Sequence, residues 1–233
     1  MYSFDSCVRY SEVGEDKKLT LNGMINYFQD CSTFHSEELH VGVGKLEALQ
    51  RVWVLSSWQI VIDRYPSLCE RIRISTWPYQ FQGFLGWRNF TMTDGDGRML
   101  AWANSLWTFL DTQTGRPARV PEEIENAYEL EERLDMNYAS RKLPMPKGGE
   151  TGDPFAVQKH HLDTNHHVNN GQYIQMAREY VPEDFRIRQM RAEYKKSALL
   201  GDMIYPVTAF EDGRYTIGLC DELGKPYAVV ELS

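Results

Sequence analysis

Residues 160–180, HHLDTNHHVNNGQYIQMAREY, decide how this chain can fold, because a cluster of polar residues meets a helix start in them. Four of the chain's six histidines lie in this stretch. Asn169 or Asn170 is a good N-cap. After them, residues that can face a core recur at helical spacing: Tyr173, Met176, Ala177 and Tyr180. The stretch therefore predicts a helix that begins at the asparagine pair, with a polar segment directly before it.

Within the polar segment, Asp163, Asn165 and His167 occupy every second position. An extended chain points alternate side chains to one side, so a carboxylate, an amide and an imidazole would share one face. They would also lie at a helix N-terminus, where amide N–H groups and the helix dipole stabilise an oxygen that gains negative charge. We therefore expect one catalytic site built from these three residues.

Outward from this helix, the first half of the chain predicts a longer helix followed by strands. Residues 19–39 place apolar side chains at near-helical intervals: Leu21, Met24, Ile25, Phe28, Cys31 and Phe34. The pattern then changes to period two, which predicts antiparallel strands at residues 52–63, 69–79, 82–93 and 98–111. Residues 94–97 (DGDG) are typical of the hairpin turn between the last two strands.

The second half is expected to repeat this order of elements. Its predicted strands lie at residues 155–161, 185–196, 203–210, 215–220 and 227–232, while 121–136 is expected to form an acidic surface helix. Asn170-Gly171 corresponds to Asn22-Gly23 at an offset of 170 − 22 = 148 residues. We therefore expect an α+β protein in which one antiparallel sheet curls around one long helix, present twice.

Composition restricts the classes of function. The chain has 233 residues, 42% of them hydrophobic, and a formal net charge of −8 with a pI near 5.3. An acidic surface argues against a nucleic-acid partner. The N-terminal stretch has neither signal-peptide nor transit character, and no apolar run of 18 residues occurs, so we expect a cytoplasmic protein without stable membrane association. The scattered cysteines predict buried free thiols rather than disulfides or a zinc site: Cys7, Cys31, Cys69 and Cys220.

Two clusters allow alternative interpretations. The histidines between His160 and His167, with Asp163, could bind zinc or iron, but their spacing does not fit a usual ligand set and no third ligand stands at a convincing distance. Five basic residues form a local positive patch: Arg186, Arg188, Arg191, Lys195 and Lys196. This patch is either a solvated strand face or a landing site for an acidic partner.

Several motifs, in this order along nearly the whole chain, resemble the acyl-acyl-carrier-protein (acyl-ACP) thioesterases of plant and bacterial fatty-acid synthesis. They are residues 26–30 (NYFQD), 53–55 (WVL), 63–66 (DRYP), 75–77 (STW), 163–170 (DTNHHVNN) with Tyr173, and 193–196 (EYKK). The resemblance implies a double hotdog fold, with an acyl-binding N-terminal hotdog at residues 1–138 and a catalytic C-terminal hotdog at 154–233. Residues 139–153, which contain Pro144, Pro146, Gly148 and Gly149, are expected to form a linker between them.

The resemblance also implies that Asp163, Asn165 and His167 are catalytic. In the family an acid and a cysteine follow the EYKK-like motif, whereas this chain has Ser197 and Ala198. Glu193 is a poor substitute for that acid, since four residues along a strand span roughly 13 Å. We expect Asp163 to activate or orient water, directly or through His167, Asn165 to hold the thioester oxygen and Ser197 to position the water.

The implied reaction ends chain elongation by hydrolysing fatty acyl-ACP to fatty acid and holo-ACP. The implied partner is ACP carrying an acyl-phosphopantetheine, which the basic patch would dock, and no metal or other cofactor is needed. We expect a monomer or homodimer. Two alternatives stay open: a metal-dependent hydrolase that uses the His160–His167 cluster, and an acyl-binding protein without catalytic activity.

Overall fold

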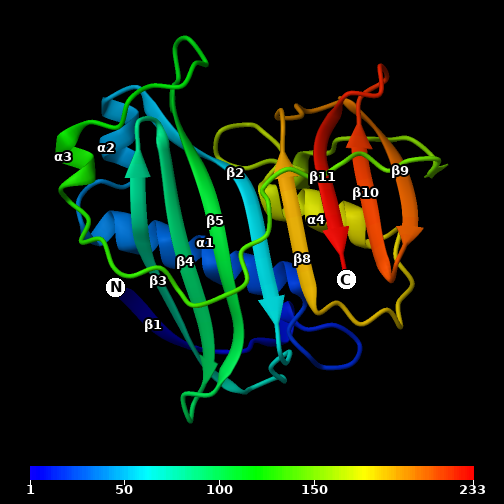
Figure 1. The fold of residues 1–233 in the computed structure, drawn as a ribbon, viewed down its shortest axis with the longest axis horizontal. Coiled ribbons are helices and arrows are strands. Elements are labelled where there is room, and N and C mark those ends of the chain that lie inside the picture. Colours follow the sequence, from blue (N-terminus) through cyan, green and yellow to red (C-terminus); the bar gives the residue numbers. More distant parts are fainter. The chain divides into compact units, whose positions relative to one another are not determined.

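The computed structural model describes residues 1–233 and shows two compact units. The N-terminal unit contains Met1–Ser56 and Ile60–Tyr138, and the C-terminal unit contains Ala139–Ser233 together with Ser57–Gln59. Each unit consists of a sheet with one main helix lying across it (Figure 1). The α+β class, with a sheet and its helix present twice, is therefore confirmed.

In the N-terminal unit the strands lie in the order β1-β3-β4-β5-β2. Their bounds are β1 Tyr2–Cys7, β2 Arg51–Ile62, β3 Arg71–Gln82, β4 Leu85–Asp94 and β5 Met99–Asp111. The strands expected from sequence are thus confirmed to within a few residues. The expected turn between β4 and β5 is also present, since Gly97 N donates to Asp94 O at 3.0 Å.

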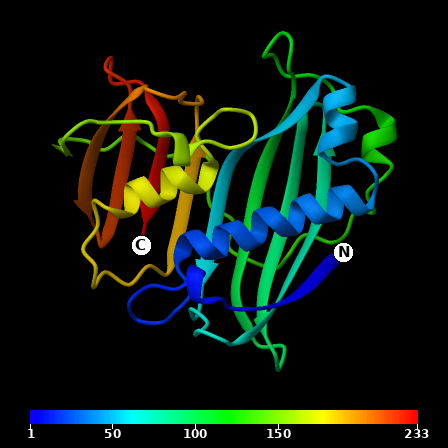
Figure 2. The same ribbon diagram turned by 180° about the vertical axis from the view of Figure 1, so that it is seen from behind.

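The long helix of this unit, α1 (Leu21–Glu38), crosses the sheet (Figure 2). Its apolar stripe is buried except for Phe34, which is exposed, and the ring of Phe28 packs against Phe90 of β4 with 5.3 Å between centroids. A fully buried Phe or Leu side chain contributes about 1.5–3 kcal/mol, so this stripe holds the helix against the sheet. The helix predicted at residues 19–39 is confirmed.

The acidic helix predicted at residues 121–136 is wrong for most of its length. Only α3, Glu122–Glu125, is helical, and it packs through the buried Ile124 against a cluster that includes α2 (Val43–Ala48). The chain after α3 hydrogen-bonds to the sheet instead: Leu134 N donates to Asn89 Oδ1 at 3.1 Å, and Trp77 Nε1 donates to Glu132 O at 2.9 Å. These side-chain partners replace the helical hydrogen bonds that the sequence pattern suggested.

In the C-terminal unit the strands lie in the order β8-β11-β10-β9-β6, and β7 also pairs with β9. The bounds are β6 Glu150–Thr151, β7 Phe155–Ala156, β8 Gln189–Tyr194, β9 Met203–Glu211, β10 Arg214–Cys220 and β11 Pro226–Leu232. The helix α4, Asn170–Arg178, lies across this sheet and buries Tyr173 and Ile174 (Figure 2).

Two expectations for this unit need correction. The strand predicted at residues 155–161 ends at Ala156 and is followed by a 3-10 helix, η2 (Lys159–His161), because His161 Nδ1 accepts from the backbone N of Gln158. The stretch 139–153, expected to be a plain linker, includes β6, which pairs with β9. The short strands β6 and β7 are ordered because both pair with the longer strand β9.

A local repeat precedes the long helix of each unit. Val13 pairs with Leu19 in an isolated antiparallel bridge, and Leu162 pairs with Val168 in the same way. Both partners are displaced by the same number of residues, since 162 − 13 = 149 and 168 − 19 = 149. The 148-residue offset expected from the Asn-Gly pairs is therefore one residue short, because those pairs are not structurally equivalent.

The backbone between the bridge partners is also repeated. Lys17 and His166 both adopt a left-handed conformation with φ of 60°, which few residues other than Gly, Asn and Asp favour. Each following helix begins with an equivalent N-cap: Thr20 accepts from Gly23 N, and Asn169 accepts from Gly171 N. The fold thus prescribes the same tight turn at the start of both helices.

The four cysteines form no disulfide. Cys31 and Cys220 are buried as expected, whereas Cys7 and Cys69 are exposed, so the prediction of buried thiols holds for two of the four. No helix in the structure combines the length and the apolar character that crossing a membrane requires.

Candidate functional site

The loop between η2 and α4 carries three of the predicted site residues, but it is not extended. Asp163 N donates to His167 O at 2.8 Å, and His166 N donates to Asp163 O at 3.1 Å, so the chain forms a tight turn. The prediction of an extended segment is therefore wrong. The alternation of Asp163, Asn165 and His167 belongs to a turn in which His166 has a positive φ.

The carboxylate of Asp163 organises this turn. Its Oδ1 accepts from the backbone N of Asn165 at 2.8 Å and from the backbone N of His167 at 3.2 Å. Asp side chains commonly stabilise turns by accepting from amides two or more residues further along. The other oxygen, Oδ2, accepts no hydrogen bond from the protein. Asp163 therefore builds the loop with one oxygen and keeps the second available for chemistry.

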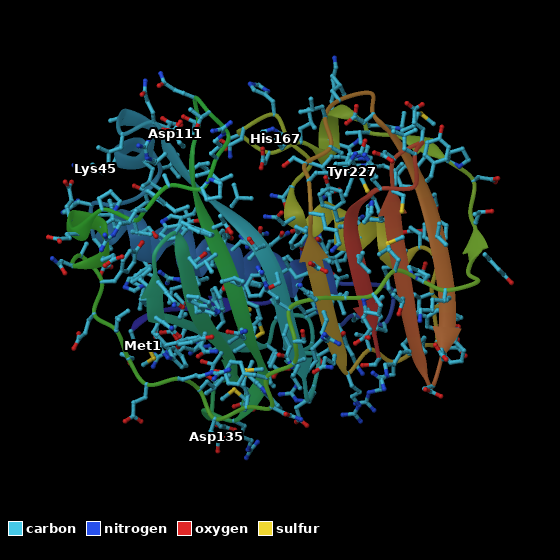
Figure 3. All side chains as sticks on the ribbon, turned by 45° about the horizontal axis from the view of Figure 1, so that its top comes forward. Met1, Lys45, Asp111, Asp135, His167 and Tyr227 are labelled. Atoms are coloured by element: carbon cyan, nitrogen blue, oxygen red, sulfur yellow. The ribbon has the colours of Figure 1, made fainter.

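Asn165 and His167 are available for a ligand. The side chain of Asn165 is exposed and that of His167 is half-buried, and neither makes a side-chain hydrogen bond within the protein. Figure 3 shows His167 at one end of the C-terminal unit. The structure thus brings Asp163, Asn165 and His167 together in one five-residue turn, held by the first of them.

The start of α4 directly follows this turn. Asn169 is the N-cap, as the sequence suggested, and its Oδ1 accepts from Gly171 N at 2.8 Å. Gln172 N donates to the backbone oxygen of Asn169 at 2.9 Å. Two amides of the first turn are therefore already satisfied. Fewer free N–H groups than expected remain for a substrate oxygen, which gives the Asn165 amide more weight as a donor.

Ser197 is next in sequence to Ala198, and Ala198 is hydrogen-bonded to the loop that carries His167. Val168 N donates to Ala198 O at 3.0 Å, which joins the end of the Asp163 loop to the turn after β8. Ala198 is fully buried, whereas the hydroxyl of Ser197 is exposed and makes no hydrogen bond within the protein. Ser197 is therefore one residue away from direct contact with the loop, which suits the proposed positioning of water.

The buried Tyr173 and the half-buried Tyr194 support this arrangement. Helical spacing placed Tyr173 on the core-facing side of a helix, and Tyr194 was part of a motif, but neither pattern predicted these contacts. Tyr173 accepts from Ala198 N at 2.8 Å, and Tyr194 donates to Asn170 O at 3.0 Å. Burial raises the pKa of both phenols well above the usual range. They therefore stay protonated at neutral pH and act as fixed hydrogen-bonding groups behind the loop. For Tyr173 the available signal was its place on the buried side of the helix α4, whereas Tyr194 ends the strand β8.

The histidine cluster does not form a metal centre. The rings of His160 and His161 touch edge to face with 4.1 Å between centroids, and His161 Nδ1 is occupied by Gln158 N. Burial, and secondarily His160, lower the pKa of His161. No group of three or more His, Cys, Asp or Glu side chains in the structure is arranged to hold a metal ion. The geometry gives no support to the metal-dependent alternative.

Most of the basic patch is neutralised by neighbouring acids. Three of its five members form ion pairs: Arg191 with Glu231, Lys195 with Glu193 and Lys196 with Asp221. Arg186 and Arg188 are exposed. The local positive charge expected from sequence is thus offset by acidic partners at three of its five positions. Glu193, which also accepts from Leu143 N at 2.9 Å, is occupied away from the loop.

Comparison with known proteins shows the same family in both units. The model of the acyl-ACP thioesterase N-terminal domain matches residues 2–128, and that of the C-terminal domain matches residues 146–221. The palmitoyl-acyl carrier protein thioesterase of Arabidopsis thaliana is 26% identical over 221 residues, which cover 87% of this chain and 53% of that protein. The dodecanoyl-[acyl-carrier-protein] hydrolase of Cinnamomum camphora is 26% identical over 237 residues, covering 93% and 61%.

Solved structures show the same fold. An acyl-ACP thioesterase from Bacteroides thetaiotaomicron aligns with a TM-score of 0.90 at 21% identity, covering 99% of this chain and 96% of that one. The 12:0-ACP thioesterase from Umbellularia californica aligns with a TM-score of 0.87 at 20% identity, covering 100% and 96%. The double hotdog fold is confirmed. The chain spans slightly more than half the length of the curated relatives it matches.

Proposed function

Since this chain belongs to the acyl-ACP thioesterase family, we propose that it hydrolyses the thioester of a fatty acyl-ACP and releases a fatty acid and holo-ACP. The observation that carries the proposal is the turn in which the Asp163 carboxylate holds Asn165 and His167 with their side chains unoccupied. A loop with a carboxylate, an amide and an imidazole supplies the groups that thioester hydrolysis requires.

The roles follow from which atoms are free. His167, half-buried and without a side-chain partner, takes the proton of the attacking water, or Asp163 does so through Oδ2. The Asn165 amide donates to the thioester oxygen as negative charge develops on it. The water oxygen bonds to the carbonyl carbon, the C–S bond breaks, and the phosphopantetheine sulfur leaves as a thiol once it receives the proton. Ser197 positions the water from the neighbouring turn.

Release of free thiol from a ladder of acyl-ACP thioesters tests this proposal. A positioned acid or base typically contributes about 10²–10⁴-fold, so Asp163→Asn and His167→Ala should each lower kcat by that order while the protein remains folded. Asp163→Asn keeps an oxygen that can accept from the two amides of the turn. The matched control is His166→Asn, an exposed neighbour whose positive φ asparagine tolerates. Turnover close to wild type in both site variants would refute the assignment.

Termination of chain elongation is the biological role that we propose for this reaction, with ACP as the partner. The cytoplasmic location stays a prediction, and the plant relatives are named as chloroplastic proteins. The second candidate, an acyl-binding protein without catalysis, is favoured by the absence of an ionisable group at Ser197 and Ala198. Tight binding of acyl-ACP without thiol release would select it.

A further inference from the structure

We propose that Asp202 is a second catalytic carboxylate of this site and that Asp202, rather than His167 or Asp163, takes the proton of the water that attacks the thioester, while His167 and Asp163 orient that water. This inference rests on the proposed function and adds a residue to it. Asp202 lies in the turn between β8 and β9, immediately before β9, and its side chain is half-buried. Four observations place it at the site and leave it free to act.

The turn that contains Asp202 contacts the loop that carries His167. Val168 N donates to Ala198 O at 3.0 Å, and the next amide along the chain, that of Leu199, donates to Asp202 Oδ2 at 2.9 Å. Two consecutive residues of this turn are therefore hydrogen-bonded to the two groups: Ala198 to the loop that carries His167, and Leu199 to the Asp202 carboxylate.

The hydrogen bonds of Asp202 leave one oxygen free, as those of Asp163 do. Oδ2 accepts from Leu199 N and from the Tyr227 hydroxyl at 3.3 Å, whereas Oδ1 accepts from no protein group. Figure 3 shows Tyr227 at the same end of the C-terminal unit as His167. A carboxylate that is oriented by two donors through one oxygen and open at the other is prepared to bind a water molecule.

Electrostatics connect Asp202 with the other acid of the site. Burial is the main cause of the raised pKa of Tyr173, and the charges of Asp202 and Asp163 both add to it. The hydroxyl of Tyr173 is thus within electrostatic reach of both acids. Asp202 forms no ion pair, since the basic residue in the same turn, Lys196, pairs with Asp221. No cationic side chain therefore occupies the Asp202 carboxylate.

The chemical step balances with this group as the base. The water oxygen bonds to the carbonyl carbon of the thioester while one water proton passes to Asp202 Oδ1. The C–S bond then breaks, the electron pair stays on sulfur, and the proton passes to the thiolate. The products are a fatty acid and a thiol. Asp163 keeps its part in building the turn, which its two amide partners already require.

A purely structural role for Asp202 makes a different prediction. Asp202 N also donates to Leu199 O at 3.1 Å, so residues 199 and 202 close a reciprocal turn before β9. A turn cap needs an acceptor oxygen, which asparagine also provides, whereas a base needs the charge. Asp202→Asn keeps the acceptor and removes the charge, and so it separates the two roles.

The test measures thiol release from acyl-ACP by full-length wild type and Asp202→Asn, with thermal unfolding alongside. We expect kcat to fall at least 100-fold with KM changed less than threefold and an unaltered melting temperature. The control is Asp212→Asn, an exposed turn residue whose φ of 50° suits asparagine, which should retain wild-type kcat. A kcat for Asp202→Asn within threefold of wild type overturns the inference.

Tyr227→Phe keeps the inference testable if Asp202→Asn does not fold. It removes one donor from the carboxylate and leaves the Leu199 hydrogen bond intact, so a pure turn cap predicts unchanged kcat. We expect kcat to fall about three- to tenfold at unchanged KM, and unchanged kcat would count against the proposal. If wild type itself releases no thiol, the proposed function fails first. If wild type is active and these variants match it, only the role of Asp202 fails.

Discussion

His35 in α1 makes the stability of the N-terminal unit sensitive to acid. Its ring is only 7% exposed, stacks on Tyr2 with 5.6 Å between centroids, and accepts through Nδ1 from Arg88 Nη1 at 2.9 Å. The direction of that hydrogen bond follows because guanidinium has no acceptor. Burial first, and the charge of Arg88 second, lower the pKa of His35 to about 3.

The magnitude follows from proton linkage. Below the ordinary histidine pKa of about 6.5 the unfolded chain binds a proton at this position that the folded protein does not bind. The free energy of unfolding therefore falls as the pH decreases from about 6.5 towards the folded pKa of about 3. At about 1.4 kcal/mol per pH unit, His35 removes roughly 2 kcal/mol of stability between pH 7 and pH 5.

Urea unfolding of wild type and His35→Asn at pH 7 and pH 5 measures this contribution. Asparagine places an oxygen where Nδ1 accepts from Arg88 but does not titrate, so wild type should lose about 2 kcal/mol more than the variant between the two pH values. His40→Asn is the control, because His40 is exposed and its φ of 57° suits asparagine. Equal losses of unfolding free energy in wild type and His35→Asn would refute the idea that His35 stays neutral in the folded protein.

Three further predictions concern the site and its surroundings. Arg186→Glu combined with Arg188→Glu should raise KM for acyl-ACP roughly tenfold and leave KM for a small acyl thioester unchanged, whereas equal effects on both substrates would remove the docking role. Asn169→Ala and Thr20→Ala should each lower the free energy of unfolding by about 1 kcal/mol, because each removes an equivalent N-cap. Dialysis against EDTA should leave thiol release unchanged, and activity restored by zinc after such dialysis would revive the metal-dependent alternative.

The order of elements could be predicted because burial leaves a periodic trace in the sequence. The residues of α1 that pack on the sheet, such as Met24 and Phe28, recur at helical spacing, and the long strands β2 to β5 alternate or run apolar. The hairpin after Asp94 was visible for a different reason, since its glycines favour a turn. Elements held by regular packing were therefore predictable from local pattern alone.

The failures occur where side chains take over backbone hydrogen bonds. Residues 155–161 have strand-like composition, yet His161 occupies the amide of Gln158 and turns the chain into η2. Likewise Asn89, on a neighbouring strand, accepts from Leu134 N and draws the segment after α3 onto the sheet. The Asn89 partner of Leu134 lies 45 residues away, so no local pattern signals it. The His161 partner of Gln158 is local, but a single side-chain contact leaves no periodic pattern in the sequence.

The candidate site was predicted from residue type and stays a prediction, whereas the extended geometry predicted for it is wrong. Alternation at Asp163, Asn165 and His167 suggested an extended strand. Instead the Asp163 carboxylate accepts from the backbone N–H groups of Asn165 and His167, which makes a turn. Both conformations bring the three residues together, so the grouping survived the error. The sequence carries no local signal for Asp202, because 39 positions separate it from Asp163 (202 − 163 = 39), and backbone contacts such as Val168 N to Ala198 O bring the two segments together.

The repeat separates what the fold requires from what the chemistry requires. The turns before α1 and α4 share the bridge, the positive φ and the N-cap, so the fold accounts for all three. At the positions equivalent to Asp163, Asn165 and His167, 149 residues earlier, the first turn has Gly14, Asp16 and Lys18.

The first turn forms without a carboxylate at its first position, since Gly14 N still donates to Lys18 O at 3.0 Å. A carboxylate nevertheless supports each turn from a different position: Asp16 Oδ1 accepts from Lys18 N at 3.0 Å in the first turn, and Asp163 Oδ1 accepts from His167 N at 3.2 Å in the second. A scaffold shared by both units can therefore account for a capping carboxylate, but it does not account for the Asn165 amide and the His167 imidazole, whose side chains make no hydrogen bond in the turn. This difference between equivalent turns supports the proposed chemical role of these two residues.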